Sequence, residues 1–451
     1  MAILAGILDL SKTYGGDKHK RLYLCVPDNK ELPRHFIAYN KQSDFDKSIV
    51  HIYITFKFKE IINDHHHGIL IHNIGRVESM ENTYEYLICC KELNIPSIQV
   101  FNKCVISKLK ENDDHIIEHI SNVCKLPSRK GHIFTIDSIH ANHYDDAISV
   151  KDNVVSIYIS NVPILLDYLS LWEHLNERVS SIYLPNKKIS MLPKHLNELC
   201  SLKERNSRIC LVMDIIYQDG VVVSKELSLC KAHISRNYDF DSDKLLNHTD
   251  YKKLNILCKT NTPHDLIQKT MIDFNQQCAN ILQTKKTGIY KHHNDHNKTI
   301  QPYHKDYNNN DLYCHTTSPI RRIVDVMNMY LLCKDLYDFS HEAESLYTSC
   351  MLEDINIKMK KIRKLQYTCK LLSIFEQHQH QIFHGQCLEK TFKNDEYHYK
   401  IYLYDIDVVY SYMSKDMLTK EYYDFKLILL NDEVYLKRKL RLIIHTTTDC
   451  S

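Results

Sequence analysis

The chain has 451 residues, which suggests roughly two to four domains, and its 43% hydrophobic and 25% charged residues are ordinary for a globular protein. The formal net charge of +2 gives no general attraction to nucleic acid, so any basic surface has to be local. The 16 cysteines form no CxxC pair, which disfavours a zinc ribbon or disulfide scaffold and favours buried thiols in a reducing compartment. No apolar run is long enough to cross a membrane, and the short apolar start lacks the basic residues of a signal peptide.

Residues 1–90 carry five short apolar segments separated by polar turns, and this pitch predicts a small β-barrel. The segments cover residues 3–8, 21–26, 35–39, 50–58 and 68–74. Three consecutive histidines at 65–67 are expected in a solvated loop rather than a metal site, because adjacent residues seldom share one face. Residues 80–127 mix helical and loop signals, and a domain boundary is expected between 115 and 128.

Three carboxylates then cluster around one loop. A strand predicted over 133–136 is followed directly by Asp137, and Asp145 and Asp146 precede a second predicted strand over 147–150. Carboxylates this close repel one another unless a cation holds them, and oxygen ligands suit Mg²⁺ or Mn²⁺. A site of this kind with open positions is what phosphoryl-transfer chemistry requires. On spacing alone, a solvated acidic turn is an equal alternative.

The middle of the chain alternates further strands and helices. The patterns predict a strand over 154–160, a helix over 165–178 and a β-hairpin within 208–223. A helix is predicted to begin at Thr262 and Pro263 and to end before Gly288. Residues 291–312 are polar and predict a surface loop.

A second chemically informative stretch begins at Ser318. Serine is a favoured N-cap and Pro319 a favoured first helical residue, which predicts that Arg321 and Arg322 lie in the first turn of a helix. Backbone N–H groups and guanidinium groups would then converge on an anion. Arginine is otherwise disfavoured at this end of a helix, so phosphate binding is preferred over an ordinary surface helix start.

The last third predicts helices followed by strands. Residues 342–380 have the pattern of one or two amphipathic helices with a basic face, either solvated or lying along a phosphate backbone. Residues 383–446 return to strand patterns and predict a second small β-barrel.

Two motifs carry a family resemblance. The stretch from Thr135 to Ala147 resembles T-I-D-x-x-x-A-x-D-x-D-D-A, a signature of the RNase II, RNase R and exosome-exonuclease family, whose members contain an RNB domain. The stretch from Tyr313 to Arg322, with Asp325 three residues on, resembles the family pattern Y-x-H-x-T-S-P-I-R-R-Y-x-D. Shorter matches follow in the same order between them, at 181–185, 191–193, 199–202, 271–275 and 288–290.

The resemblance implies a multidomain α+β protein. It assigns an N-terminal OB-type β-barrel to 1–90, a linker or extension to 91–127, a central α/β RNB-like catalytic domain to 128–382 and a C-terminal S1-like small β-barrel to 383–451. The implied activity is hydrolytic 3′-to-5′ exoribonuclease action that degrades single-stranded RNA to nucleoside 5′-monophosphates. RNA is the expected partner and a membrane is not. A cytoplasmic monomer is expected, and protein partners are unassigned.

By matched position, Asp137, Asp145 and Asp146 would hold Mg²⁺ or Mn²⁺ and the attacking water. Arg321 would hold the scissile phosphate and stabilise its developing charge, so Asp145 and Arg321 are the expected catalytic residues.

The expected RNA-binding residues are Tyr183, Tyr313 and Arg322. Tyr183 matches a family tyrosine that stacks on a terminal base, and stacking accepts any base.

The chain departs from the family pattern at several positions. His143 occupies the second of four acidic positions, where imidazole would be a poorer Mg²⁺ ligand and would favour Mn²⁺ or weak binding. Ile323 replaces the tyrosine after the arginine pair. A catalytically degenerate RNB-like RNA-binding protein is therefore the alternative function, and a partner-binding scaffold is a third. The nuclease is preferred because RNA binding alone does not need a carboxylate cluster.

Overall fold

The structure is a computed structural model that describes residues 2–16, 20–40, 51–93, 98–111, 115–141, 143–175, 178–294, 297–302, 312–349 and 352–445. The chain divides into two units. The first contains Met1–Asn94, Tyr183–Lys187 and Lys361–Ser451, and the second contains Ile95–Ile182 and Lys188–Lys360. The multidomain α+β class is confirmed, whereas the domain boundaries expected near 90, 127 and 382 stay predictions.

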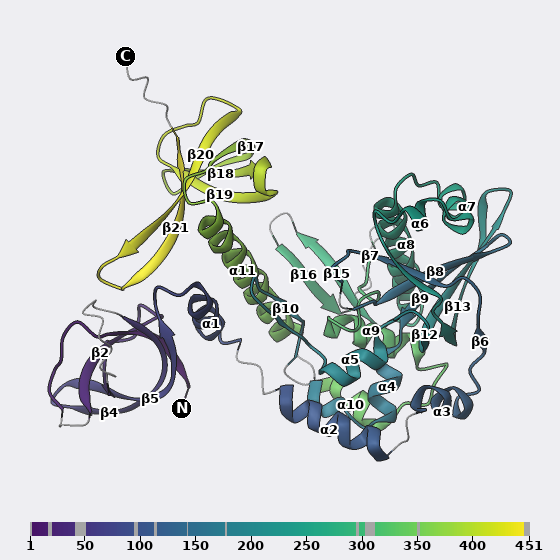
Figure 1. Ribbon diagram of the computed structural model, residues 1–451, viewed down its shortest axis with the longest axis horizontal. Helices are drawn as coiled ribbons and strands as arrows, with labels where there is room; N and C mark the ends of the chain where they lie inside the picture. The colour runs from purple at the N-terminus through teal and green to yellow at the C-terminus, as the bar shows by residue number, and fades with distance from the viewer. Residues whose placement is uncertain are drawn as a thin grey trace. The chain divides into compact units, whose positions relative to one another are not determined.

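The first unit begins with a closed five-stranded barrel in the order β1-β2-β3-β5-β4, drawn in purple in Figure 1. Leu8, Ile54 and Phe56 are buried inside it, because successive side chains of a strand point to opposite faces. The histidines at 65–67 are not in a loop, as predicted, but begin the last strand and pair with both neighbours. The strands are β1 (Leu4–Asp9), β2 (Arg21–Pro27), β3 (His35–Tyr39), β4 (Ile52–Ile62) and β5 (His65–Arg76), and α1 (Met80–Cys90) follows.

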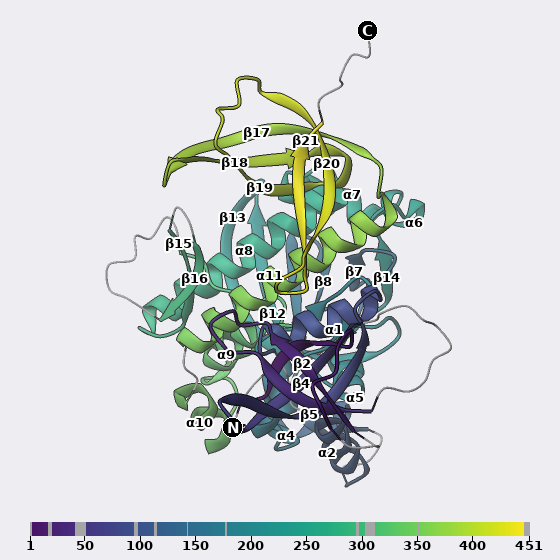
Figure 2. The same ribbon diagram turned by 90° about the vertical axis from the view of Figure 1, so that its left-hand side faces the viewer.

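The C-terminal sheet, yellow to green in Figure 2, has the order β19-β18-β17-β20-β21. This is the cyclic strand order of the N-terminal barrel, opened between the third and fifth strands. The hydroxyl of Tyr410 on β19 donates to the carbonyl of Leu440 on β21 at 3.2 Å and so joins the two edges. The elements are α11 (Leu352–Gln377), β17 (Ile382–Lys393), β18 (Glu396–Leu403), η2 (Tyr404–Ile406), β19 (Val408–Ser414), β20 (Tyr422–Asp432) and β21 (Lys437–Ile444).

The second unit is built on a seven-stranded sheet in the order β14-β7-β8-β9-β12-β13-β6 (Figure 1). Its two outer pairs are parallel and the pairs between them are antiparallel. Ala147, Tyr158 and Val212 lie in a buried cluster on this sheet. The strands are β6 (Ser128–Arg129), β7 (Phe134–Asp137), β8 (Asp146–Lys151), β9 (Val154–Ser160), β12 (Ser207–Gln218), β13 (Val221–His233) and β14 (Arg236–Asp239).

Helices and short hairpins surround this sheet. They are α2 (Ile98–Glu111), α3 (Ile116–Val123), α4 (Val162–Tyr168), η1 (Trp172–Leu175), β10 (Ile182–Tyr183), β11 (Lys188–Ile189), α5 (Lys194–Cys200), α6 (Asp243–Leu246), α7 (Thr249–Cys258), α8 (Pro263–Thr284), β15 (Ile289–Asn294), β16 (Asn297–Pro302), α9 (Ile323–Cys333) and α10 (His341–Ser349). None of the helices in the described part of the chain is long and apolar enough to cross a membrane.

Two local predictions in this unit are wrong. The helix expected over 165–178 is two pieces, α4 and η1, because Ser170 adopts a left-handed backbone with φ of 50°. The polar stretch expected as a loop over 291–312 contains the paired strands β15 and β16, while 303–311 lie outside the described residues. By contrast, the start of α8 is confirmed, since the Thr262 hydroxyl accepts the N–H of Asp265 at 3.1 Å.

Candidate functional site

Neighbouring strand ends bring the predicted carboxylates together. Asp137 is the last residue of β7 and Asp146 the first of β8, and these strands are paired through Phe134 and Ile148. The backbone carbonyl of Asp145 accepts the N–H of Ser160 on β9, which extends the sheet by one bond. The loop between β7 and β8 therefore returns the second and third carboxylates to the end of the strand that carries the first.

Asp145 is 5% exposed and has two protein partners. Its Oδ1 accepts the backbone N–H of Ile320 at 3.0 Å, and its Oδ2 lies 3.2 Å from Nε of Arg321. Burial raises the pKa of Asp145, and Arg321 and the Ile320 N–H oppose that rise. The other end of the guanidinium donates to the Ser318 hydroxyl at 2.9 Å. Asp145 and Ser318 thus fix the direction of Arg321, whose side chain is 44% exposed.

Asp137 and Asp146 form the strained part of the carboxylate cluster. Burial raises the pKa of Asp137 to about 6, and repulsion by Asp145 adds to the rise. Burial raises the pKa of Asp146 well above its ordinary value, and repulsion by Asp137 comes next. The Oδ2 atom of Asp137 is buried and has no hydrogen-bond partner among the described residues. Buried carboxylates that repel one another are relieved by a cation, so this donor set fits a hard divalent ion.

The geometry is looser than a closed metal cage. Among the described residues, no three of Asp137, His143, Asp145 and Asp146 have ligand atoms all within 4.8 Å of one another. Both oxygens of Asp145 already meet the Ile320 N–H or the Arg321 guanidinium. Asp137 and Asp146 are therefore the better candidates for direct metal ligands, and Asp145 is better suited to orienting Arg321.

His143 faces a different partner. Its Nε2 lies 3.4 Å from the side-chain amide of Asn197 on α5, which can donate to it, and its Nδ1 is buried without a hydrogen-bond partner among the described residues. Burial, followed by the charge of Lys188, lowers the pKa of His143 to about 4. The imidazole is therefore neutral near pH 7, and its role as a metal ligand stays a prediction.

A cavity of about 660 Å³ adjoins His143. Its polar lining includes Lys188, Lys194, Lys203 and Asn197. Burial lowers the pKa of Lys188 to about 8, while the charge of Asp145 raises it and that of Arg321 lowers it. The electrostatic coupling of Lys188 to both partners of the ion pair shows that the cavity opens beside the carboxylate cluster. Three lysines make it suitable for an anion.

The predicted helix start at Ser318 is wrong. Helix α9 begins at Ile323, and Arg322 is its N-cap residue. The reason is Asp325, a carboxylate with no exposed surface that accepts the Ser318 N–H at 2.7 Å and a guanidinium N–H of Arg322 at 2.8 Å. These bonds hold residues 318–322 in a turn before the helix. Arg322 is thus paired with a buried carboxylate, and its RNA-binding role stays a prediction.

Sequence reasoning missed an asparagine that organises this turn. The side-chain oxygen of Asn275 on α8 accepts the N–H and hydroxyl of Thr316, and its amide donates to the hydroxyls of Tyr313 and Thr317. Asn275 is 1% exposed. A polar residue on the buried face of a long helix was the available signal, because such a group needs partners. Tyr313 is held by this network, with the ammonium of Lys291 5.1 Å from its ring centre.

Tyr183 belongs to the other unit and is described there alone. Its side chain is 44% exposed, and its backbone N–H donates to Gln366 of α11 at 2.8 Å. It lines a groove of about 500 Å³ together with Arg363, Tyr367 and Lys370. Exposed aromatic rings beside basic groups are typical of surfaces that bind single-stranded nucleic acid.

Comparison with known proteins identifies the domain. Residues 127–245 match the RNB domain. Ribonuclease R of Chlamydia pneumoniae is 30% identical over 171 residues, which is 36% of this chain and 25% of that protein. DIS3-like exonuclease 2 of Xenopus tropicalis is 32% identical over 130 residues, which is 27% of this chain and 16% of that protein. The sequence match thus spans about a quarter of the length of the first of these relatives.

Solved structures extend the likeness of fold to nearly the whole chain. Mycoplasma genitalium RNase R in complex with ribose-methylated single-stranded RNA has a TM-score of 0.72 at 16% identity, covering 98% of this chain and 89% of that one. Yeast Ssd1, described as a pseudonuclease, has a TM-score of 0.62 at 13% identity, covering 94% of this chain and 66% of that one. With the RNB match and the ribonuclease R relatives, the chain is a divergent member of the RNB-domain family.

Proposed function

We propose that the chain is a metal-dependent hydrolytic 3′-to-5′ exoribonuclease that degrades single-stranded RNA to nucleoside 5′-monophosphates. The observation that carries the proposal is the pairing of Arg321 with buried Asp145 beside the two repelling carboxylates of Asp137 and Asp146. A protein that only binds RNA needs cations along the phosphates and has no use for a buried carboxylate cluster next to one of them.

The side chains divide the work as follows. Asp137 and Asp146, with Asp145 nearby, would hold Mg²⁺ or Mn²⁺, which would supply charge stabilisation and an activated water. Arg321 binds a non-bridging oxygen of the scissile phosphate, and Asp145 orients its guanidinium. As water adds to phosphorus, the bond to the 3′ oxygen breaks and that oxygen takes a proton. The released nucleotide keeps the 5′ phosphate, and Arg321 stabilises the charge that develops on the phosphate.

RNA is the proposed partner. The three lysines of the cavity beside His143 suit phosphate groups. In the other unit, the groove with Tyr183, Tyr367, Arg363 and Lys370 suits bases and phosphates without sequence preference. The solved Mycoplasma genitalium enzyme is described in complexes with single-stranded and double-stranded RNA, which supports RNA as the ligand class. The proposed location is the cytoplasm, since the described cysteines are free thiols.

A second candidate function is RNA binding without cleavage. Two observations favour it: His143 stands where the family pattern has an acid, and both oxygens of Asp145 have protein partners. The likeness to yeast Ssd1 supports only a shared fold. In this function the cavity lysines would still bind RNA, and Asp145 would serve only to position Arg321.

The deciding experiment uses single-stranded RNA labelled at its 5′ end, incubated with Mg²⁺ or Mn²⁺. The wild-type chain is compared with Asp145→Asn and with Asp335→Asn, a control at a carboxylate that is 73% exposed on its side chain. The exonuclease predicts a ladder that shortens from the 3′ end with wild type and the control, and none with Asp145→Asn. If all three proteins bind the RNA and none shortens it, the non-cleaving function is correct.

A further inference from the structure

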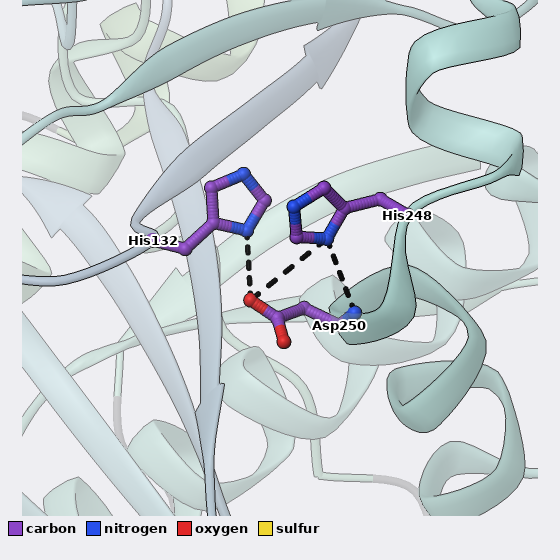
Figure 3. A group of neighbouring side chains, drawn as sticks. All are labelled: His132, His248 and Asp250. Carbon is purple, nitrogen blue, oxygen red and sulfur yellow. Dashed lines mark hydrogen bonds and ion pairs between the residues drawn. The ribbon is translucent and has the colours of Figure 1, made fainter.

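A group of possible metal ligands lies apart from the carboxylate cluster. His132 stands on the segment that enters β7, and His248 and Asp250 stand at the start of α7 (Figure 3). The Nδ1 atoms of both histidines and a carboxylate oxygen of Asp250 all lie within 4.8 Å of one another. It is the one such group among the described residues.

The group is separate from the proposed catalytic centre. His132 lies at the beginning of β7, whereas Asp137 ends the same strand. Five residues of extended chain place the two positions about 16 Å apart. The inference therefore does not depend on whether the chain cleaves RNA.

The three side chains already point at one another. Nδ1 of His132 lies 2.8 Å from Oδ2 of Asp250, and Nδ1 of His248 lies 3.9 Å from the same oxygen (Figure 3). Two ligands of a tetrahedral zinc ion, each about 2.0–2.1 Å from the metal, lie about 3.3 Å apart. The observed distances fall on either side of that value, so small side-chain rotations would bring the three atoms around one ion.

The protonation pattern favours a cation between these groups. The backbone N–H of Asp250 donates to Nδ1 of His248 at 3.1 Å, so this nitrogen carries a lone pair and no proton. Nε2 of His132 lies 3.2 Å from the hydroxyl of Tyr238. When Nε2 donates to that hydroxyl, Nδ1 of His132 directs a lone pair at the Asp250 carboxylate. A buried outer partner of this kind is typical of histidines that bind metals.

A second positive imidazole is disfavoured here. The rings of His132 and His248 stack with their centres 3.9 Å apart. Burial, followed by the neighbouring His248, lowers the pKa of His132, while Asp250 opposes that change. A neutral imidazole is the form that binds a metal.

We propose that His132, His248 and Asp250 bind one transition-metal ion, and that zinc is the ion this donor set favours. Two imidazole nitrogens and one carboxylate oxygen suit zinc, with water in the fourth position, whereas Mg²⁺ prefers oxygen ligands alone. Binding requires His248 to release the Asp250 N–H, which is one helix-capping bond. The ion joins the entry of β7 to the first turn of α7 and thereby braces the strand that carries Asp137.

The test uses the full chain after removal of metals with a chelator. Zinc is titrated by competition against a chromogenic chelator, and the unfolding temperature is followed with and without zinc. Wild type is compared with His248→Ala and with Asp250→Asn, which keeps an oxygen acceptor for His132 but is a weaker ligand. His341→Ala is the control, because His341 is an exposed histidine on α10 in the same unit.

The proposal predicts one zinc site with a dissociation constant of about 1 µM or lower, absent from His248→Ala. Asp250→Asn weakens zinc binding at least about 100-fold while its metal-free unfolding temperature stays near wild type. Zinc raises the unfolding temperature of wild type and His341→Ala by about 3 °C or more, and excess Mg²⁺ does not displace it. If Asp250→Asn and His248→Ala bind as much zinc as wild type, or if wild type binds none, the group is only a hydrogen-bonded cluster and the proposal is wrong.

Discussion

Arg321 and Asp145 form an ion pair in which only one partner is buried. Nε of Arg321 lies 3.2 Å from Oδ2 of Asp145, whose other oxygen accepts the Ile320 N–H at 3.0 Å. The carboxylate side chain is 5% exposed and the arginine side chain 44% exposed. The buried carboxylate therefore fixes the guanidinium while leaving much of it accessible, which is the arrangement that a phosphate-binding arginine requires.

Replacing Arg321 by lysine tests this relationship. Lysine keeps the positive charge but has no planar fork, so it cannot contact the Asp145 carboxylate and a phosphate in the same way. We expect the single-turnover cleavage rate to fall about 100-fold to 1,000-fold, with RNA affinity changed by less than about tenfold. Rates and affinities are measured on the same labelled RNA. Equal losses in rate and affinity would mean that Arg321 only binds substrate.

The buried pair of Arg322 and Asp325 predicts a large effect on stability. Asp325 has no exposed surface and accepts hydrogen bonds from Ser318 and Arg322. Asp325→Ala leaves the Arg322 charge and the Ser318 N–H without their partner, so we expect a loss of about 3–5 kcal/mol in the free energy of unfolding. Urea unfolding measures it. Asp335→Ala, at the exposed pair with Lys285, is the control and should unfold near the wild-type midpoint.

Elements with regular local patterns could be predicted from the sequence. The strands β7, β8, β9, β12 and β13 were expected within a few residues of their observed bounds, because their apolar residues face a common sheet core. The start of α8 follows from its Thr262 cap and Pro263. The proximity of Asp137 to Asp145 and Asp146 followed from the short loop between two paired strands.

Features that depend on distant partners could not be predicted. The Ser318-Pro319 pair has the local signal of a helix start, but the Asp325 carboxylate captures the Ser318 N–H and delays the helix to Ile323. No local pattern assigns Asp145 to the Ile320 N–H, which lies 175 residues away. His132 and His248 likewise meet only through the packing of α7 against the entry of β7.

His315 predicts a pH dependence of stability. Burial lowers its pKa from 6.5 to about 4, and its Nδ1 has no hydrogen-bond partner among the described residues. Between these values the unfolded chain binds a proton that the folded chain does not, so stability is lost as pH falls from about 6.5 toward 4. His315→Gln removes this contribution.

The measurement compares urea unfolding at pH 7 and pH 5. Wild type should lose roughly 2 kcal/mol more than His315→Gln over this interval. His341→Gln, at an exposed histidine, is the control and should follow wild type. An unchanged pH dependence in His315→Gln would contradict the prediction.

Lys188 predicts an alkaline limit to RNA binding. Burial lowers its pKa to about 8, so the ammonium is charged below this pH and becomes neutral above it. A phosphate in the cavity favours the charged form, so RNA affinity should fall as pH rises through about 8. Lys188→Arg keeps its charge throughout this range because a guanidinium does not lose its proton. RNA dissociation constants are measured from pH 7 to pH 9.5 at constant ionic strength. We expect the alkaline loss in wild type and in Lys252→Arg, an exposed control on α7, and its absence in Lys188→Arg. The same alkaline loss in all three proteins would show that the charge of Lys188 does not contact RNA.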